Sequence, residues 1–150
     1  MKNLMQHLNT LVITAWVGSL WAVGYLAVPI LFKAQPDRQL AGMLAGEMFL
    51  WAGYLGMLCG GYLLLGQLWQ WGRDAPRQAV FRLIIAMLLI TLLVQGVIQP
   101  QMADLKAQAL PLEVMHSAYA DKFKMLHGIS SIAYLLESLL GAALIIKSRR

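Results

Sequence analysis

The chain has few of the residues from which soluble enzymes and disulfide-rich proteins are built. Charged residues make up 13% of its 150 residues, compared with roughly 25% in soluble globular proteins. Its single cysteine, Cys59, cannot form an intramolecular disulfide, and we interpret it as a small buried core residue. The sequence also lacks G-x-S-x-G, P-loop, G-x-G-x-x-G and H-E-x-x-H motifs, so it offers no catalytic residues of the kinds found in soluble enzymes.

Apolar residues, in contrast, make up 59% of the chain, which is more than a soluble protein of this size can cover. As a helix with a rise of about 1.5 Å per residue, each long apolar run is of the length needed to span a hydrocarbon core of roughly 30 Å. We therefore predict an all-α, four-helix transmembrane bundle that forms one integral membrane domain over residues 1–150. The four predicted spans are residues 8–32, 40–69, 82–101 and 124–146.

The net charge of +5 comes from basic residues that flank these apolar runs, as in most inner-membrane proteins. Aromatic and basic residues do not interleave as in an RNA-binding protein, so we expect the lipid bilayer, and no nucleic acid, as a partner. The positive-inside rule predicts both termini in the cytoplasm of a bacterial inner membrane, because seven Lys and Arg residues fall on that side and five on the other. The seven are Lys2, Arg73, Arg77, Arg82, Lys147, Arg149 and Arg150.

The positions of two prolines, Pro29 and Pro111, indicate where helices are expected to kink or end. Pro29 removes a backbone donor near the end of the first run, so we expect a kink or a helix end there. The third run closes at Gln95–Pro100, and the longer polar stretch 101–122 is expected to hold an interfacial helix with a break at Leu110–Pro111. No internal repeat or pair of broken helices is evident, which is why the sequence does not favour a transporter.

Two ionisable residues lie within the fourth apolar run, His127 near its start and Glu137 near its middle. Ionisable side chains inside a membrane are costly and mark functional sites, so these two are the first candidates. Counting the helical rise places Glu137 about 15 Å deeper than His127. Above Glu137, in the outer half of the bundle, the polar residues expected to meet are Glu47, Tyr54, Gln95, Gln99 and His127.

Three interpretations of this polar group remain open. In the first, the group is a hydrogen-bonded network that holds the helices together. In the second, it is a haem or metal site. In the third, Glu137, Glu47 and His127 form a path for protons or a solute. For the second interpretation, haem b and copper are the candidate cofactors. The candidate cofactor ligands are His127, Glu47, Gln95 and His7, and the candidate metal ligands are His127 and His116, which could not bind one ion if a single helix ran through both.

One face of the second run is lined with glycine, at the small-x-x-x-small spacing that lets helix backbones approach closely in lipid. Internal packing is the first interpretation of this face. Self-association, or docking to a larger membrane complex, is the alternative, and it corresponds to a non-enzymatic scaffold or accessory subunit. The glycines are Gly42, Gly46, Gly53, Gly56 and Gly60.

Several short motifs follow one another in a characteristic order. They are His7, WVG at 16–18, PILF at 29–32, AGMLAGEMF at 41–49, Gln99–Pro100 and FKMLHGISS at 123–131. In this order and spacing the chain resembles the bacterial relatives of transmembrane protein 205, a four-helix family known as domain of unknown function 4149. The resemblance covers nearly the whole chain and implies a four-helix membrane protein.

The early motifs also resemble, more distantly, the copper-resistance D family and the membrane protoporphyrinogen oxidase family of the haem pathway. The residues that carry this second resemblance are His7, Trp16, Gly18, Pro29 and Phe32. It implies copper handling or haem binding near the first helix. Ile30 stands where the oxidase family has an arginine, so oxidase activity does not follow, and a haem- or metal-binding protein that is not an enzyme is the first functional hypothesis.

Overall fold

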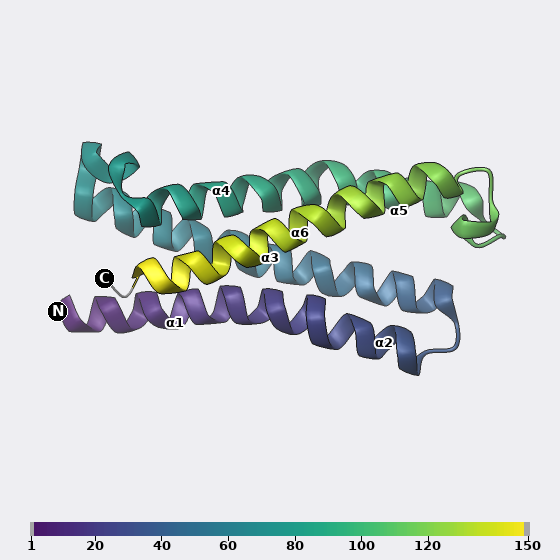
Figure 1. The fold of residues 1–150 in the computed structure, drawn as a ribbon, viewed down its shortest axis with the longest axis horizontal. Coiled ribbons are helices and arrows are strands. Elements are labelled where there is room, and N and C mark those ends of the chain that lie inside the picture. The colour runs from purple at the N-terminus through teal and green to yellow at the C-terminus, as the bar shows by residue number, and fades with distance from the viewer. Residues whose placement is uncertain (1, 149–150) are drawn as a thin grey trace.

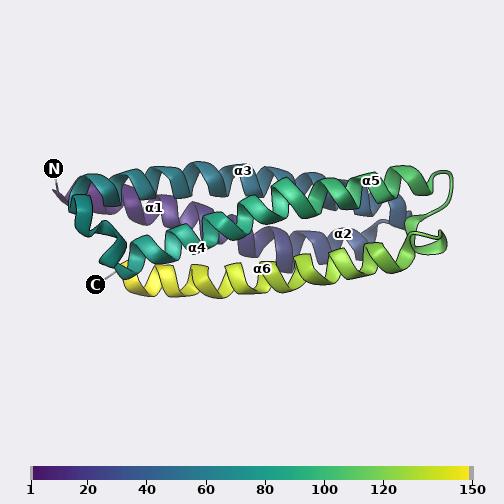
Figure 2. The same cartoon turned by 90° about the horizontal axis from the view of Figure 1, so that it is seen from above.

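Among the described residues, four long helical spans lie side by side along one axis (Figure 1, Figure 2). The computed structural model describes residues 2–148, apart from the side chains of Lys2 and Asn3, so the side chains of Lys2, Arg149 and Arg150 used in the charge count lie outside it. Within this range, four spans are long and apolar enough to cross a membrane: Leu4–Ala34, Arg38–Arg77, Ala79–Ala109 and Ala120–Ser148. The predicted all-α, four-span membrane fold is therefore confirmed.

The first and third spans each consist of three helical parts. The first contains α1 (Lys2–Trp21), the π-helical segment η1 (Ala22–Ala27) and α2 (Val28–Ala34). The third contains α4 (Ala79–Leu93), the π-helical segment η3 (Val94–Ile98) and α5 (Gln99–Ala109). The second span is α3 (Arg38–Trp71) with the 3₁₀ segment η2 (Gly72–Arg77), and the short η4 (Val114–His116) precedes the fourth, α6 (Ala120–Ser148).

Both π-helical segments end two residues before a proline. The residue just before Pro29 donates its N–H to Val23, and the residue before Pro100 donates to Val94, five positions back in each case. A proline has no N–H and clashes with the carbonyl four residues earlier, and the wider π turn relieves this crowding without ending the helix. A pair of interrupted helices therefore exists, contrary to what the sequence indicated.

Of the two expectations at Pro29, a kink or a helix end, the helix does not end there: it is interrupted by η1 just before the proline and continues to Ala34. One expectation about the polar stretch 101–122 is wrong for the same reason. The third span continues through Pro100 to Ala109, so residues 101–109 extend the spanning helix and do not form a separate interfacial one. The predicted break at Leu110–Pro111 is where α5 ends.

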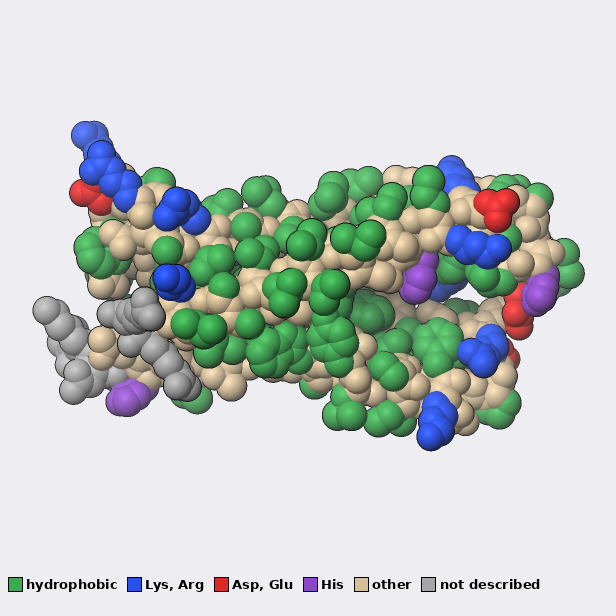
Figure 3. All heavy atoms as spheres, viewed as in Figure 1, with side chains coloured by type: hydrophobic (Ala, Val, Ile, Leu, Met, Phe, Trp, Pro, Cys, Tyr) green, Lys and Arg blue, Asp and Glu red, His purple; other side chains and the backbone are tan. Residues whose placement is uncertain are grey.

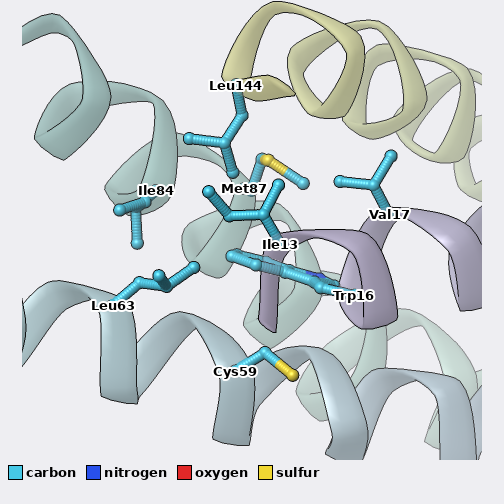
Figure 4. Close-up of a cluster of buried hydrophobic side chains, with 8 residues drawn as sticks. All are labelled: Ile13, Trp16, Val17, Cys59, Leu63, Ile84, Met87 and Leu144. Carbon is cyan, nitrogen blue, oxygen red and sulfur yellow. The ribbon is translucent and has the colours of Figure 1, made fainter. Parts of the chain in front are cut away.

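Side chains from all four spans close the bundle in the half that contains the start of α1 and the end of α6 (Figure 1, Figure 4). Trp16 is 1% exposed and lies against the glycine face of α3. A Cβ on Gly56 would lie 2.6 Å from the Trp16 Nε1 atom, and one on Gly60 would lie 2.8 Å from Cη2 of the same ring. The cluster consists of Ile13, Trp16, Val17, Cys59, Leu63, Ile84, Met87 and Leu144.

At the other end, the four spans separate into two hairpins. There α2 packs against α3, and α5 packs against α6 through a second cluster of Ile98, Met102, Leu105 and Leu126. The two pairs diverge towards this end of the bundle, and the molecular surface is hollowed between them (Figure 1, Figure 3). Gly56 and Gly60 therefore belong to the packed half of the bundle, where the spans approach most closely.

Two adjacent glycines on α3 test how much this close approach contributes. In Gly60→Ala the new methyl group meets Leu88 at 2.6 Å and Trp16 at 2.8 Å, so we expect the free energy of unfolding to fall by about 1–3 kcal/mol. In Gly61→Ala nothing lies within 4 Å of the new methyl group, so stability should be unchanged or slightly raised. Unfolding by denaturant in mixed micelles measures both, and equal stabilities would contradict the packing role of this face.

Candidate functional site

A cavity of about 1000 Å³ lies between the two hairpins, and residues of all four spans line it. It is open at the end of the bundle where the hairpins diverge (Figure 3). Its walls are mainly apolar, and its polar side chains gather at the floor, at mid-height and at the mouth. The apolar wall residues include Leu20, Val28, Phe32, Phe49, Val94 and Met102.

Glu137 lies at the floor of the cavity, where it is 6% exposed. The Thr91 hydroxyl oxygen is 2.7 Å from the Glu137 Oε1 atom and 3.0 Å from the Met87 carbonyl oxygen. This hydroxyl has one proton and two acceptors within reach. The hydroxyl is the donor in both contacts, and the Glu137 carboxyl oxygen is an acceptor. The pair links α4 to α6.

Two tyrosines beside Glu137 link the first span to α6. The Tyr134 hydroxyl donates to the Leu20 carbonyl oxygen, and the Tyr25 hydroxyl donates to the Ser138 Oγ atom at 2.9 Å. The two rings meet edge to face with centroids 6.1 Å apart. Tyr134 lies so close to η1 that any side chain at Gly24 would overlap its ring. The floor of the cavity therefore depends on the π-helical part of the first span.

At mid-height, Gln95 joins η3 to α3. Its Nε2 atom donates to the Phe49 carbonyl oxygen at 2.8 Å. The amide reaches this carbonyl because residue 53 is glycine; a Cβ there would overlap the Gln95 side chain. The Oε1 atom of the same amide is buried and has no hydrogen-bond partner among the described residues. Gln95 thus belongs to the packing between the hairpins as well as to the cavity wall.

Basic residues stand at the mouth of the cavity. The Lys106 Nζ atom donates to the Gly42 carbonyl oxygen at 3.1 Å and lies 5.7 Å from the centroid of the Phe123 ring. Phe123 in turn stacks on His127, with centroids 6.1 Å apart and planes at 10°. Arg38, the first residue of α3, also lines the mouth, as does the carboxylate residue Glu113.

The structure brings together part of the predicted site. Predicted residues that line the cavity are Gln95, Gln99, His127, Glu137, Gly42, Gly46 and Gly53. Glu47 and Tyr54 do not line it, because each follows an inward-facing glycine and is therefore turned by about 100° away from the cavity. Both are exposed, and the Tyr54 ring meets Trp51 on the outside of α3.

The three histidines lie in separate places. His127 is at the cavity, His7 is exposed near the start of α1, and His116 lies in η4 with its Nε2 atom 3.8 Å from Glu113 Oε2. Within residues 2–148, no three His, Cys, Asp or Glu side chains are grouped so that they could hold a metal ion. A shared site for His127 and His116, or for His127 and Glu47, is not formed.

Sequence reasoning missed several residues at both ends of the cavity. Thr91 precedes Gln95 by four positions, and Tyr134 precedes Glu137 by three, spacings that place each pair on one helical face. These spacings could have identified both residues. Lys106 and Arg38 had no comparable signal, because the apolar pattern places them in polar connections and not in spans that reach the cavity.

Substitution of Glu137 tests whether its hydrogen bond to Thr91 stabilises the protein by linking α4 to α6. Glu137→Ala removes the partner of Thr91 from a buried position, so we expect a loss of about 1–3 kcal/mol in unfolding free energy. Glu137→Gln keeps a donor and an acceptor and should retain most of the stability. Glu47→Ala, at an exposed carboxylate, is the control and should change stability by less than about 0.5 kcal/mol. Thermal unfolding in detergent distinguishes them, and a fully stable Glu137→Ala protein would refute the linking role.

Comparison with known proteins identifies a family but no function. A family model described as a domain of unknown function, DUF4149, matches residues 11–111. No curated protein and no solved structure matches the chain. The matched range covers most of the first span and all of the second and third, and it ends before α6, which carries His127 and Glu137. Because this match includes well over half of the chain, the protein belongs to the DUF4149 family.

Proposed function

We propose that this protein binds a membrane-soluble organic ligand in the cavity between its two hairpins. The observation that carries the proposal is the cavity itself, whose volume of about 1000 Å³ is at the upper end of the range for small-molecule and cofactor sites. Mainly apolar walls with a few polar groups at defined heights are also typical of such sites. With both termini in the cytoplasm of a bacterial inner membrane, as the positive-inside rule favours, the mouth faces outwards.

Haem b is the specific cofactor to test, because it combines a flat apolar ring with two carboxylates. His127 is the one histidine that lines the cavity, so it would be the residue that holds the haem iron, and Arg38 and Lys106 would hold the carboxylates. Free copper is less well supported, since His7 and His116 lie away from His127 and no three-ligand group occurs within residues 2–148. The resemblance to haem- and copper-handling families motivates both candidates.

An absorption spectrum of the protein purified in mild detergent tests the haem candidate. We expect a Soret band that is lost in His127→Ala and retained in His116→Ala, because only the first of these histidines lines the cavity. Elemental analysis of the same samples measures copper and iron. A colourless, metal-free protein would exclude haem and copper as stable cofactors while leaving the cavity open to other organic ligands.

A cavity-filling substitution tests ligand binding even while the chemical identity of the ligand is open. A Cβ on Gly46 meets nothing within 4 Å, and the residue lines the cavity, so Gly46→Trp places an indole in the ligand's space. Gly66→Trp is the matched control on the same helix, at an equally open position that does not line the cavity.

Native mass spectrometry and solvent extraction measure the apolar molecules that co-purify with each variant. We expect Gly46→Trp to weaken ligand binding about tenfold or more, which corresponds to about 1.4 kcal/mol, and Gly66→Trp to leave it unchanged. Equal retention in the two variants, or no retained molecule in the wild type, would contradict the proposal.

A further inference from the structure

We infer that the cavity takes an anionic amphiphile, with its carboxylate or phosphate group at the mouth on Lys106 and Arg38. The hydrocarbon part runs between the hairpins towards the floor at Glu137. This inference rests on the proposed ligand-binding function and specifies the chemical class of the ligand.

Lys106 is the residue that carries the argument. It lies in α5, three residues before the end of the third span, is half-buried, and directs its Nζ atom across the mouth to the Gly42 carbonyl oxygen at 3.1 Å. An ammonium group has three donors, and this is the one hydrogen bond that the described residues give it. No described carboxylate lies within 4.0 Å of it; the ion pairs that do form are Arg77–Asp74, Lys124–Asp121 and His116–Glu113. A partly desolvated cation without a counter-ion is costly, and an anionic ligand supplies the missing partner.

Arg38 adds a second positive charge from the opposite hairpin. It lines the mouth and has no carboxylate within 4.0 Å among the described residues. The start of α3 itself is not the anion site, because Asp37 Oδ1 already accepts the N–H groups of Gln39 and Leu40 at 2.9 and 3.0 Å. The guanidinium, which suits carboxylate and phosphate geometry, is therefore the available group.

The remaining charges at the mouth leave it positive. Glu113 is the one described acidic residue lining this end, and its carboxylate lies 3.8 Å from His116 and not within ion-pair distance of Lys106 or Arg38. Below the charges, the walls are mainly apolar, with Gln95 at mid-height, down to the polar floor. A charged end followed by an apolar body matches a lipid-like anion, whereas a small soluble anion leaves the apolar walls without a partner.

Oleate and oleyl alcohol test this inference because they have the same chain and differ at the head group. Binding of each to the purified full-length protein is measured by native mass spectrometry above pH 8, where oleate is ionised. We expect the wild type to prefer oleate by about tenfold or more. Lys106→Met, which retains the aliphatic stem, should lose most of this preference without weakening oleyl alcohol binding. Lys106→Arg should restore the preference.

The control is Lys124→Met, which removes a lysine side chain that pairs with Asp121 outside the cavity and should leave the preference intact. Butyrate serves as the soluble anion, and we expect it not to compete with oleate. Equal binding of oleate and oleyl alcohol by the wild type, an undiminished preference in Lys106→Met, or competition by butyrate would each overturn the anionic amphiphile. If neither oleate nor oleyl alcohol binds to the wild-type protein or to Gly46→Trp, the result counts against the ligand-binding function itself.

Discussion

The fold depends on the close contact between Trp16 and the glycine face of α3. Lipid tails are as apolar as leucine, so helices in a membrane associate through packing and not through expulsion of water. Gly56 and Gly60 let the large indole approach the α3 backbone, and the other core side chains of the four spans pack around it (Figure 4). This contact lies in the half of the bundle that contains the chain termini. The four spans are therefore held together at one end, and the two hairpins are free to diverge at the other, which is where the cavity forms.

Two prolines interrupt the helices in the half of the bundle where the hairpins diverge. Pro29 and Pro100 lie in corresponding positions of the two hairpins, each just after a π-helical segment. Tyr134 packs against the first of these segments at Gly24, and Gln95 projects from the second towards Gly53. Each interruption thus meets the opposite hairpin through one large and one small residue. Interrupted helices in corresponding positions of two halves are a recurring feature of membrane binding sites, and here both adjoin the same cavity.

The membrane fold could be predicted from the sequence because long apolar runs allow few structures other than spanning helices. The site could be predicted only in part. Depth along a helix follows from residue counting, which placed Gln95, Gln99 and His127 at the same end of the bundle above Glu137. Direction around a helix is harder to assign: the charge of Glu47 suggests an inward-facing side chain, although the glycines of α3 mark the inward face and Glu47 is not on it. Lys106 was missed because the continuation of the third span past Pro100 depends on a π turn that propensity does not indicate.

Glu137 lies where the packed half of the bundle meets the open half. On one side are Met87 and the apolar core; on the other are the tyrosines and the cavity. A carboxyl group deeper in the core would have no partner, and one nearer the mouth would be exposed beside basic residues. At this boundary it hydrogen-bonds Thr91 and still borders a space that a ligand or water can enter. The carboxyl group at the floor and the ammonium group at the mouth therefore lie at opposite ends of one apolar cavity, an arrangement that orients an amphiphile with its charge outwards and its chain inwards.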